Sequence, residues 1–299
     1  MRVQTVRCED YRLRVLTWGA GPRHAVVLPG MSASYHTLAP QIRLLRRLGY
    51  ATHLIELPGT SLGPPLRRDQ ARFSQLAQCV AGALDSLGVR HAVFVGHSLG
   101  GGIALHLALA RRDLVEGLVL IAPVGLGRSL LWTYKLFGIP LLGRALMRPY
   151  RRASAGYVRR FLVGDRRRDD AHFIGTLLRM ERPSLAKLQS MRAIIWANGP
   201  ERLQRWVSLV LPGGEQTTFS VRPRLTELRG IPMLVLWGQQ DRVICAGDTA
   251  GCRSAGLDAE IRVLPGAGHM LPLEAPAWTI AHLARFLVRL ASAPARSAA

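Results

Sequence analysis

Residues 92–110 read AVFVGHSLGGGIALHLALA, and the fold can be argued outward from this stretch. The run AVFV at 92–95 is short and continuously apolar, which is typical of a strand buried on both faces of a parallel sheet. The segment GGIALHLALA at 101–110 is apolar over the length of a helix. Between them stands GHSLG at 96–100. A G-x-S-x-G pattern between a strand and a helix predicts a tight turn that presents a serine hydroxyl.

Ser98 is therefore a candidate nucleophile. We expect the backbone at Ser98 to be strained, and side chains at Gly96 or Gly100 to collide with the neighbouring chain. The helix N-terminus beneath the turn offers amide protons and a positive dipole to an oxyanion. The alternative is a purely structural glycine-rich turn, and the strand before the motif and the helix after it favour the nucleophile.

The first 123 residues alternate short apolar runs with helical patterns. Further runs at 24–28, 51–57 and 118–121 predict buried strands, and the spacing at 38–48 and 73–87 predicts helices. Residues 1–18 predict an antiparallel pair of strands ahead of this series. Strands that alternate with helices indicate an α/β fold with a mostly parallel, doubly wound sheet.

The alternation of predicted strands and helices ends after Pro123. Residues 124–226 contain no convincing strand and offer amphipathic or basic helical stretches instead. Strands resume at 233–237 and 260–264, and a closing helix is predicted at 275–290. We therefore predict a core made of residues 1–123 and 227–290, a helical cap inserted at 124–226, and a frayed tail at 291–299. The cap could be a second packed domain or a lid, and its place after the sixth strand favours a lid.

A serine hydroxyl needs a base, and the base needs an acid that orients it. Two late strands end in suitable residues at the sheet edge where Ser98 is expected. The run MLVLWG leads into Asp241, and RVLPGAG leads into His269. The chain order Ser, Asp, His is the order of this architecture. We predict that Asp241 is the acid and that His269 is the base.

Several rival residues are set aside. Asp248 and Asp258 fall away from a strand end, and we expect Glu274 to cap the last helix. His97 and His106, which flank or follow the nucleophile, are interpreted as packing or surface residues.

Two backbone amides are candidates for the oxyanion hole. One is the N–H of Leu99, directly after the nucleophile, and the other is the N–H of Met31 in the loop that follows HAVVL. The alternative for the second is that Pro29-Gly30 forms a simple turn.

These residues resemble the α/β-hydrolase superfamily over nearly the whole chain, with the insertion where that family carries its lid. The matching segments are VGHSLGGG around Ser98, WGQQDRVI around Asp241 and PGAGHMLPLEAP around His269. The resemblance implies that Ser98 attacks an acyl carbon, His269 shuttles the proton, Asp241 orients His269, and water resolves the acyl-enzyme. We expect no metal and no cofactor. Pro29-Gly30 departs from the His-Gly that many members carry at this loop.

The resemblance is specific for the fold and not for a substrate. We expect hydrolysis of a carboxylic ester, thioester or lactone, with acyl transfer, C–C bond hydrolysis or haloperoxidase-like chemistry as alternatives on the same three residues. A serine at position 98 argues against the branches whose nucleophile is an aspartate. A non-catalytic ligand receptor is the alternative from a different class, and three retained residues argue against it.

The predicted cap supplies the hints about substrate. Its large aromatic side chains would line an apolar cavity that suits a medium-chain acyl or aromatic ester. The candidate substrate-binding residues are Trp132, Phe137, Trp196 and Trp206. The alternative is that these aromatic side chains form the core of the cap itself.

The net charge of +21 raises the question of nucleic-acid binding. Only two of the 40 basic residues are lysines, the charge is spread along the chain, and no nucleic-acid-binding motif is present. We therefore expect a small-molecule substrate and no nucleic acid.

The four cysteines lack metal-ligand spacing, which favours reduced thiols, although a bridge between Cys245 and Cys252 stays open. Neither a signal peptide nor an apolar run of membrane-spanning length is found, so we expect a cytoplasmic protein.

Overall fold

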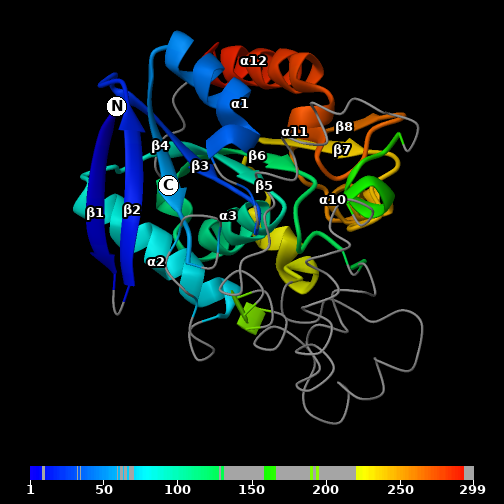
Figure 1. The fold of residues 1–299 in the computed structure, drawn as a ribbon, viewed down its shortest axis with the longest axis horizontal. Helices are drawn as coiled ribbons and strands as arrows, with labels where there is room; N and C mark the ends of the chain where they lie inside the picture. The colour runs from blue at the N-terminus through cyan, green and yellow to red at the C-terminus, as the bar shows by residue number, and fades with distance from the viewer. Residues whose placement is uncertain are drawn as a thin grey trace.

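The computed structural model describes residues 1–8, 11–31, 33, 35–58, 60, 63, 66, 71–127, 129–130, 158–165, 189–190, 193–194 and 220–292. Within these residues the strands form one sheet of eight, in the order β1-β2-β4-β3-β5-β6-β7-β8 (Figure 1). The strands are β1 (Arg2–Cys8), β2 (Tyr11–Trp18), β3 (Arg23–Leu28), β4 (Tyr50–Glu56), β5 (Ala92–His97), β6 (Val115–Ile121), β7 (Met233–Gly238) and β8 (Ala259–Leu264).

The sheet is mostly parallel. Strand β2 pairs antiparallel with both β1 and β4, and every neighbouring pair from β4 to β8 is parallel. The antiparallel pair predicted for residues 1–18 is therefore confirmed, as is the α/β fold with a doubly wound sheet. Parallel strands present their C-terminal ends at the same edge of a sheet, so the loops after β3, β5, β7 and β8 gather there.

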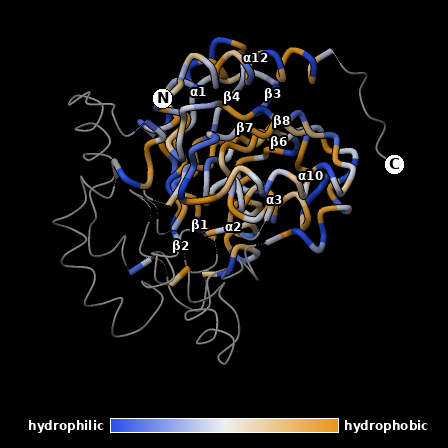
Figure 2. Tube along the Cα trace, turned by 90° about the vertical axis from the view of Figure 1, so that its right-hand side faces the viewer, coloured by the Kyte–Doolittle hydropathy of each residue, from blue (hydrophilic) through white to orange (hydrophobic). Residues whose placement is uncertain are grey.

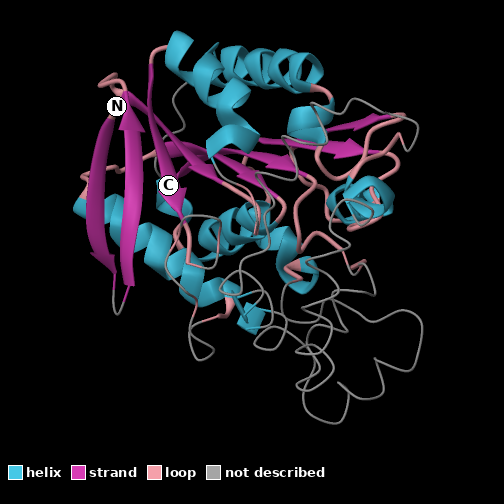
Figure 3. Ribbon diagram, in the orientation of Figure 1, coloured by secondary structure: helices cyan, strands magenta, loops and turns pink. Residues whose placement is uncertain are grey.

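Helices cover both faces of the sheet, as Figures 1 and 3 show. The helices are α1 (Tyr35–Arg47), α2 (Phe73–Ser86), α3 (Leu99–Ala110), α10 (Ala250–Ser254), α11 (Leu271–Glu274) and α12 (Pro276–Ser292). Helices α1 and α12 lie side by side on one face, whereas α2 and α3 pack on the other. Short turns of 3-10 helix lie at Arg112–Leu114, Arg222–Leu228 and Ala246–Thr249, and a π-helical turn lies at Val158–Leu162.

The alternation of side chains along the strands builds two apolar layers. On β3, Val26 points into the layer beneath α2 and α3, whereas Val27 points into the layer beneath α1 and α12. Every residue of β5 is buried, which explains why its run AVFV at 92–95 is continuously apolar. Figure 2 shows hydrophobic residues gathered along the strands between the helices.

Several predicted boundaries are wrong by a few residues, including the start of β6, which is Val115 rather than Leu118. Helix α1 begins at Tyr35 rather than at Leu38. The ring of Tyr35 stacks on that of Trp18 in β2, with a centroid distance of 5.4 Å. Helix α12 continues to Ser292, so Ala291 is helical and does not belong to a frayed tail. The rest of that predicted tail, residues 293–299, lies outside the described residues.

Most of the predicted cap also lies outside the described residues, so the cap and its boundaries stay a prediction. The part of the insertion that is described includes residues 158–165 (Figure 1). In the described part of the chain, no helix combines the length and apolar character that crossing a bilayer requires.

Candidate active site

Ser98 lies on the turn between β5 and α3. Its φ is 52° and its ψ is −115°, so the backbone occupies a region that non-glycine residues rarely adopt. A Cβ on Gly96 would lie 2.6 Å from the Cα of Gly101, and a Cβ on Gly100 would lie 2.1 Å from the carbonyl oxygen of Leu28. The predicted strain and the predicted need for both glycines are therefore confirmed.

The structure brings Ser98, His269 and Asp241 together in a chain of hydrogen bonds. Nε2 of His269 lies 3.0 Å from Oγ of Ser98, and Nδ1 of His269 lies 2.8 Å from Oδ2 of Asp241. The three residues follow β5, β8 and β7, so three loops meet at one edge of the sheet. His269 and Asp241 are only 4% and 7% exposed, which removes water that would weaken their interaction.

The carboxylate of Asp241 is held from three further sides. Its Oδ1 accepts the backbone N–H groups of Val243 at 2.8 Å and Ile244 at 3.0 Å. Its Oδ2 accepts the indole N–H of Trp237 at 3.1 Å. A carboxylate can only accept from the imidazole, so Nδ1 of His269 carries the hydrogen and Nε2 presents a lone pair to the serine hydroxyl in the neutral ring.

The partners of the Asp241 carboxylate are candidate site residues that the sequence analysis missed. The two amides stand two and three residues after the aspartate, which is the spacing of an Asx turn and gives a sequence signal for them. Trp237 ends the buried strand MLVLW and gives no comparable signal, because a core tryptophan looks the same with or without a partner for its N–H.

One oxyanion candidate directly follows Ser98 in the chain, and the other belongs to a loop that passes close to it. The N–H of Leu99 belongs to the first turn of α3, where amides have no intrahelical acceptor. The loop after β3 passes close to the serine, because a Cβ on Gly30 would lie 3.2 Å from the Cβ of Ser98. Met31 follows directly in that loop and is half-buried.

The rival acids have other partners. Asp248 accepts hydrogen bonds from the backbone N–H of Ser129 at 3.1 Å and from its hydroxyl at 2.6 Å. Glu274 is the last residue of α11, and its carboxylate accepts the N–H groups of Gly164 and Gly268. The expectation that Glu274 caps the last helix is therefore wrong, because α12 begins only at Pro276.

The predicted substrate contacts cannot be placed, since Trp132, Phe137, Trp196 and Trp206 lie outside the described residues. In the described ranges, no three His, Cys, Asp or Glu side chains are grouped so that they could hold a metal ion. All four cysteines are described, and no disulfide joins any of them.

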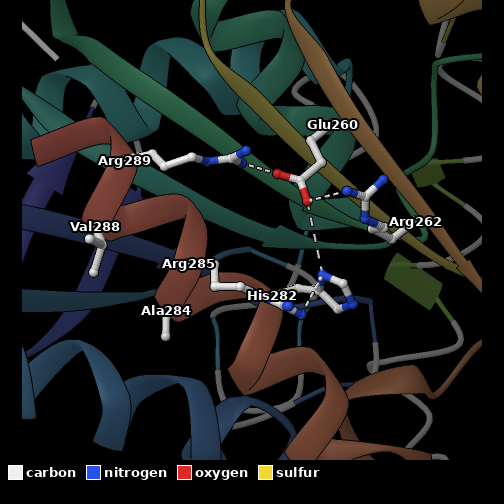
Figure 4. Close-up of a pocket in the computed structure, with 7 residues that line it drawn as sticks. All are labelled: Glu260, Arg262, His282, Ala284, Arg285, Val288 and Arg289. Atoms are coloured by element: carbon white, nitrogen blue, oxygen red, sulfur yellow. Dashed lines mark hydrogen bonds and ion pairs between the residues drawn. The ribbon is translucent and has the colours of Figure 1, made fainter. Parts of the chain in front are cut away.

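A separate pocket lies between β8 and the end of α12 and contains none of the three clustered residues (Figure 4). It is lined by Glu260, Arg262, His282, Ala284, Arg285, Val288 and Arg289. Arg289, Arg262 and His282 point toward the carboxylate of Glu260, and Arg262 lies 3.0 Å from it. Among the described residues that line the pocket, Glu260 is the only acidic one, and it is already paired with its basic neighbours.

Comparison with known proteins agrees with the fold and the motifs. A model of the alpha/beta hydrolase family matches residues 25–282. A 2-hydroxy-6-oxononadienedioate/2-hydroxy-6-oxononatrienedioate hydrolase of Comamonas testosteroni is 28% identical over 260 residues, covering 85% of this chain and 80% of that protein. A 2-hydroxy-6-oxo-6-phenylhexa-2,4-dienoate hydrolase of Burkholderia cepacia is 27% identical over 258 residues, with the same coverage.

Among solved structures, an epoxide hydrolase superposes with a TM-score of 0.74 at 19% identity, covering 97% of this chain and 99% of that one. At this identity the likeness concerns the fold. Because the family model matches most of the length of the chain, the chain belongs to the alpha/beta hydrolase family.

Proposed function

We propose that this protein is a serine hydrolase that cleaves a carboxylic ester, thioester or lactone, with Ser98 as nucleophile, His269 as general base and acid, and Asp241 as the group that orients His269. The observation that carries the proposal is the unbroken chain of contacts from Oγ of Ser98 through His269 to the buried carboxylate of Asp241, at 3.0 Å and 2.8 Å.

The first half of the reaction forms an acyl-enzyme. Nε2 of His269 takes the hydroxyl proton as Oγ of Ser98 bonds to the carbonyl carbon. The negative charge that develops on the carbonyl oxygen is stabilised by the N–H groups of Leu99 and Met31. Asp241 stabilises the imidazolium, which then gives its proton to the leaving oxygen or sulfur as the bond to the acyl carbon breaks.

The second half releases the acid. His269 takes a proton from water, the hydroxyl oxygen bonds to the acyl carbon, and the same imidazolium returns the proton to Oγ of Ser98 as the ester bond breaks. All proton transfers pass through His269 and Ser98. The proposed cycle therefore consumes one water and requires no group that the chain does not supply.

A fluorophosphonate probe tests the nucleophile directly, because the serine oxygen displaces fluoride from phosphorus and stays labelled. We expect the wild-type protein to be labelled and Ser98→Ala to remain unlabelled, with both variants giving the same circular dichroism spectrum. Folded wild-type protein that resists labelling would contradict the proposal and favour a receptor.

A second candidate function is hydrolysis of a C–C bond next to a ketone on the same three residues. It is supported by relatives of similar length whose names describe hydrolases of 2-hydroxy-6-oxo-dienoates, at 27–28% identity over 85% of this chain. In this reaction the leaving group is a carbon atom, which must accept a proton as the bond breaks.

Substrate assays separate the two functions. Turnover of p-nitrophenyl esters that rises with acyl chain length supports an ester hydrolase with an apolar pocket, whereas a flat or short-chain profile counts against that pocket. Turnover of 2-hydroxy-6-oxo-6-phenylhexa-2,4-dienoate, followed as loss of its dienoate absorbance, supports the C–C hydrolase. Ser98→Ala is the blank for both assays.

The cap and its pocket remain part of the proposal. We infer that residues 124–226 form a lid and that Trp132, Phe137, Trp196 and Trp206 contact an apolar acyl or aromatic group. Replacing each of these four aromatic residues with alanine in turn tests this, because loss of a contact residue should raise KM for long-chain esters more than for acetate esters.

A further inference from the structure

The backbone of His269 and of the residues on both sides of it makes hydrogen bonds that the proposed reaction does not use. The N–H of Gly268 donates to both carboxylate oxygens of Glu274 at 3.1 Å. The carbonyl oxygen of His269 lies 3.0 Å from Nε2 of His97. The N–H of Met270 donates to the carbonyl oxygen of Leu162 at 3.2 Å. Three consecutive residues are thus each bonded to a different part of the chain.

The His97 contact defines how that ring is protonated. A carbonyl oxygen can only accept, so Nε2 of His97 carries the hydrogen and Nδ1 is a bare lone pair in the neutral ring. The ring is 2% exposed, and its Nδ1 is buried with no hydrogen-bond partner among the described residues. Burial, together with the nearby His269, lowers the pKa of His97 to about 3.

His97 also separates two parts of the site. Its ring centroid lies 5.2 Å from that of His269, and a Cβ on Gly30 would lie 3.0 Å from its Nδ1. An uncharged ring at this place fills the space between the base and the loop after β3 without adding a positive charge beside the imidazolium of His269.

The Glu274 contact ties the inserted segment to the same loop. Besides Gly268, the carboxylate accepts the N–H of Gly164 at 2.8 Å. Gly164 and Gly268 are in such close contact that a Cβ on Gly268 would lie 2.5 Å from the backbone nitrogen of Gly164. Arg242, next to Asp241, donates to the carbonyl oxygens of Arg160 and Val163 at 3.2 Å and 3.1 Å. Residues 158–165 are thus hydrogen-bonded to the loop that carries Asp241 and to the loop that carries His269.

We propose that His97 and Glu274 are positioning residues for His269: His97 holds the His269 carbonyl, and Glu274 holds the preceding amide jointly with residues 158–165 of the insertion. The inference rests on the proposed role of His269 as the base. A base works only when Nε2 stays within hydrogen-bond reach of Oγ, and side chains that fix the backbone of His269 keep it there.

The test for His97 compares three variants by the rate of fluorophosphonate labelling at Ser98, which reports the base without depending on a substrate pocket. His97→Gln keeps an N–H near the position of Nε2, His97→Asn is too short to reach the carbonyl, and His97→Leu has no donor. We expect His97→Asn and His97→Leu to be labelled about tenfold more slowly, as befits one lost hydrogen bond, and His97→Gln to stay within about threefold of wild type.

The test for Glu274 uses a matched control at an exposed ion pair. Glu274→Leu removes both acceptors, whereas Glu227→Leu removes a carboxylate that pairs with Arg224 on the surface. We expect about tenfold slower labelling for Glu274→Leu, with a shift of the acidic limb of its pH–rate profile, where His269 becomes protonated, and no change for Glu227→Leu. Residues 158–165 should also become more susceptible to proteolysis in Glu274→Leu.

The outcomes distinguish this inference from the proposed function. If folded wild-type protein is not labelled, the proposed function fails. If wild type is labelled but the variants of His97 and Glu274 react at its rate, the positioning inference alone fails. Equal slowing in His97→Gln and His97→Leu also overturns the role of the His97 hydrogen bond. Thermal melts identify any variant that is unfolded. His97→Asn then replaces His97→Leu, and Glu274→Gln, which keeps only one of the two acceptor oxygens and should still be labelled more slowly than wild type, replaces Glu274→Leu.

Discussion

Trp237 donates its indole N–H to the same oxygen of Asp241 that faces His269, over 3.1 Å. The donor is shared with the carbonyl oxygen of Ile244, also at 3.1 Å, and the ring is fully buried. A core side chain of β7 therefore holds the carboxylate in the direction of the imidazole, so the sheet itself orients the proposed acid.

Replacing Trp237 with phenylalanine removes this donor and keeps most of the ring. We expect kcat to fall about tenfold, because the carboxylate loses one charge-assisted hydrogen bond and with it part of its fixed orientation. Steady-state kinetics on a p-nitrophenyl ester measure the effect. Trp278→Phe, on α12 against His282, is the matched control and should leave kcat unchanged.

The choice between Asp241 and Asp248 as the acid can be decided by one pair of variants. Asp241→Asn should lower kcat by about 10³-fold or more with the fold intact, because an amide N–H can face Nδ1 and disfavour the required tautomer. Asp248→Asn should lose mainly stability, since that carboxylate holds Ser129. Near-normal turnover in Asp241→Asn would mean that the acid has been assigned wrongly.

Gly100→Ala tests the close approach of α3 to the loop after β3. The new Cβ would lie 2.1 Å from the carbonyl oxygen of Leu28, so the loop or the helix must move. We expect the free energy of unfolding to fall by about 1–3 kcal/mol, the usual range for overpacking, and labelling of Ser98 to slow. Urea unfolding measures the first effect. Gly247→Ala, whose nearest contact is 3.4 Å to Sγ of Cys245, should change neither quantity.

His53 predicts a dependence of stability on pH. The imidazole is 5% exposed between Thr17 and His24, and burial, followed by the charge of His24, lowers its pKa from 6.5 to about 4. Between these values the unfolded chain binds a proton that the folded chain does not, so the free energy of unfolding falls as the pH drops from 6.5 to about 4. Above pH 6.5 the imidazole is neutral in both the folded and the unfolded chain, so His53 no longer makes the free energy of unfolding depend on pH.

Urea unfolding across this pH range measures the slope. His53→Asn removes the titrating group, so its curve should be flatter than that of wild type. His97, whose pKa is also lowered, accounts for part of the slope that remains. A slope equal to that of wild type in His53→Asn would show that the residue is not held in its neutral form.

The sequence predicts the strands and the turn at Ser98 well because both depend on local patterns. Buried parallel strands must be apolar along their whole length, and the turn at Ser98 needs glycines at fixed positions. Helix α1 is less predictable at its start, since the ring contact of Tyr35 with Trp18 depends on β2, a distant strand. Pro40, inside the helix, also suggests a later start than the one observed.

The proposed roles of His97 and Glu274 could not be predicted in the same way. Their partners are main-chain atoms of Gly164, Gly268 and His269, and N–H and C=O groups of this kind occur throughout the chain. A backbone acceptor leaves no mark in the residue types around it, so only the folded arrangement reveals that a histidine or a glutamate is bonded there.

The position of His269 just beyond β8, an edge strand of the sheet, has a consequence for the order in which the protein is assembled. Ser98 leaves the ribosome 171 residues before His269, so the turn that carries Ser98 can form long before the imidazole is synthesised. Any turnover that needs both side chains must wait until β8 has been synthesised and has paired with β7. The onset of activity therefore marks the docking of the final strand and not the first collapse of the chain.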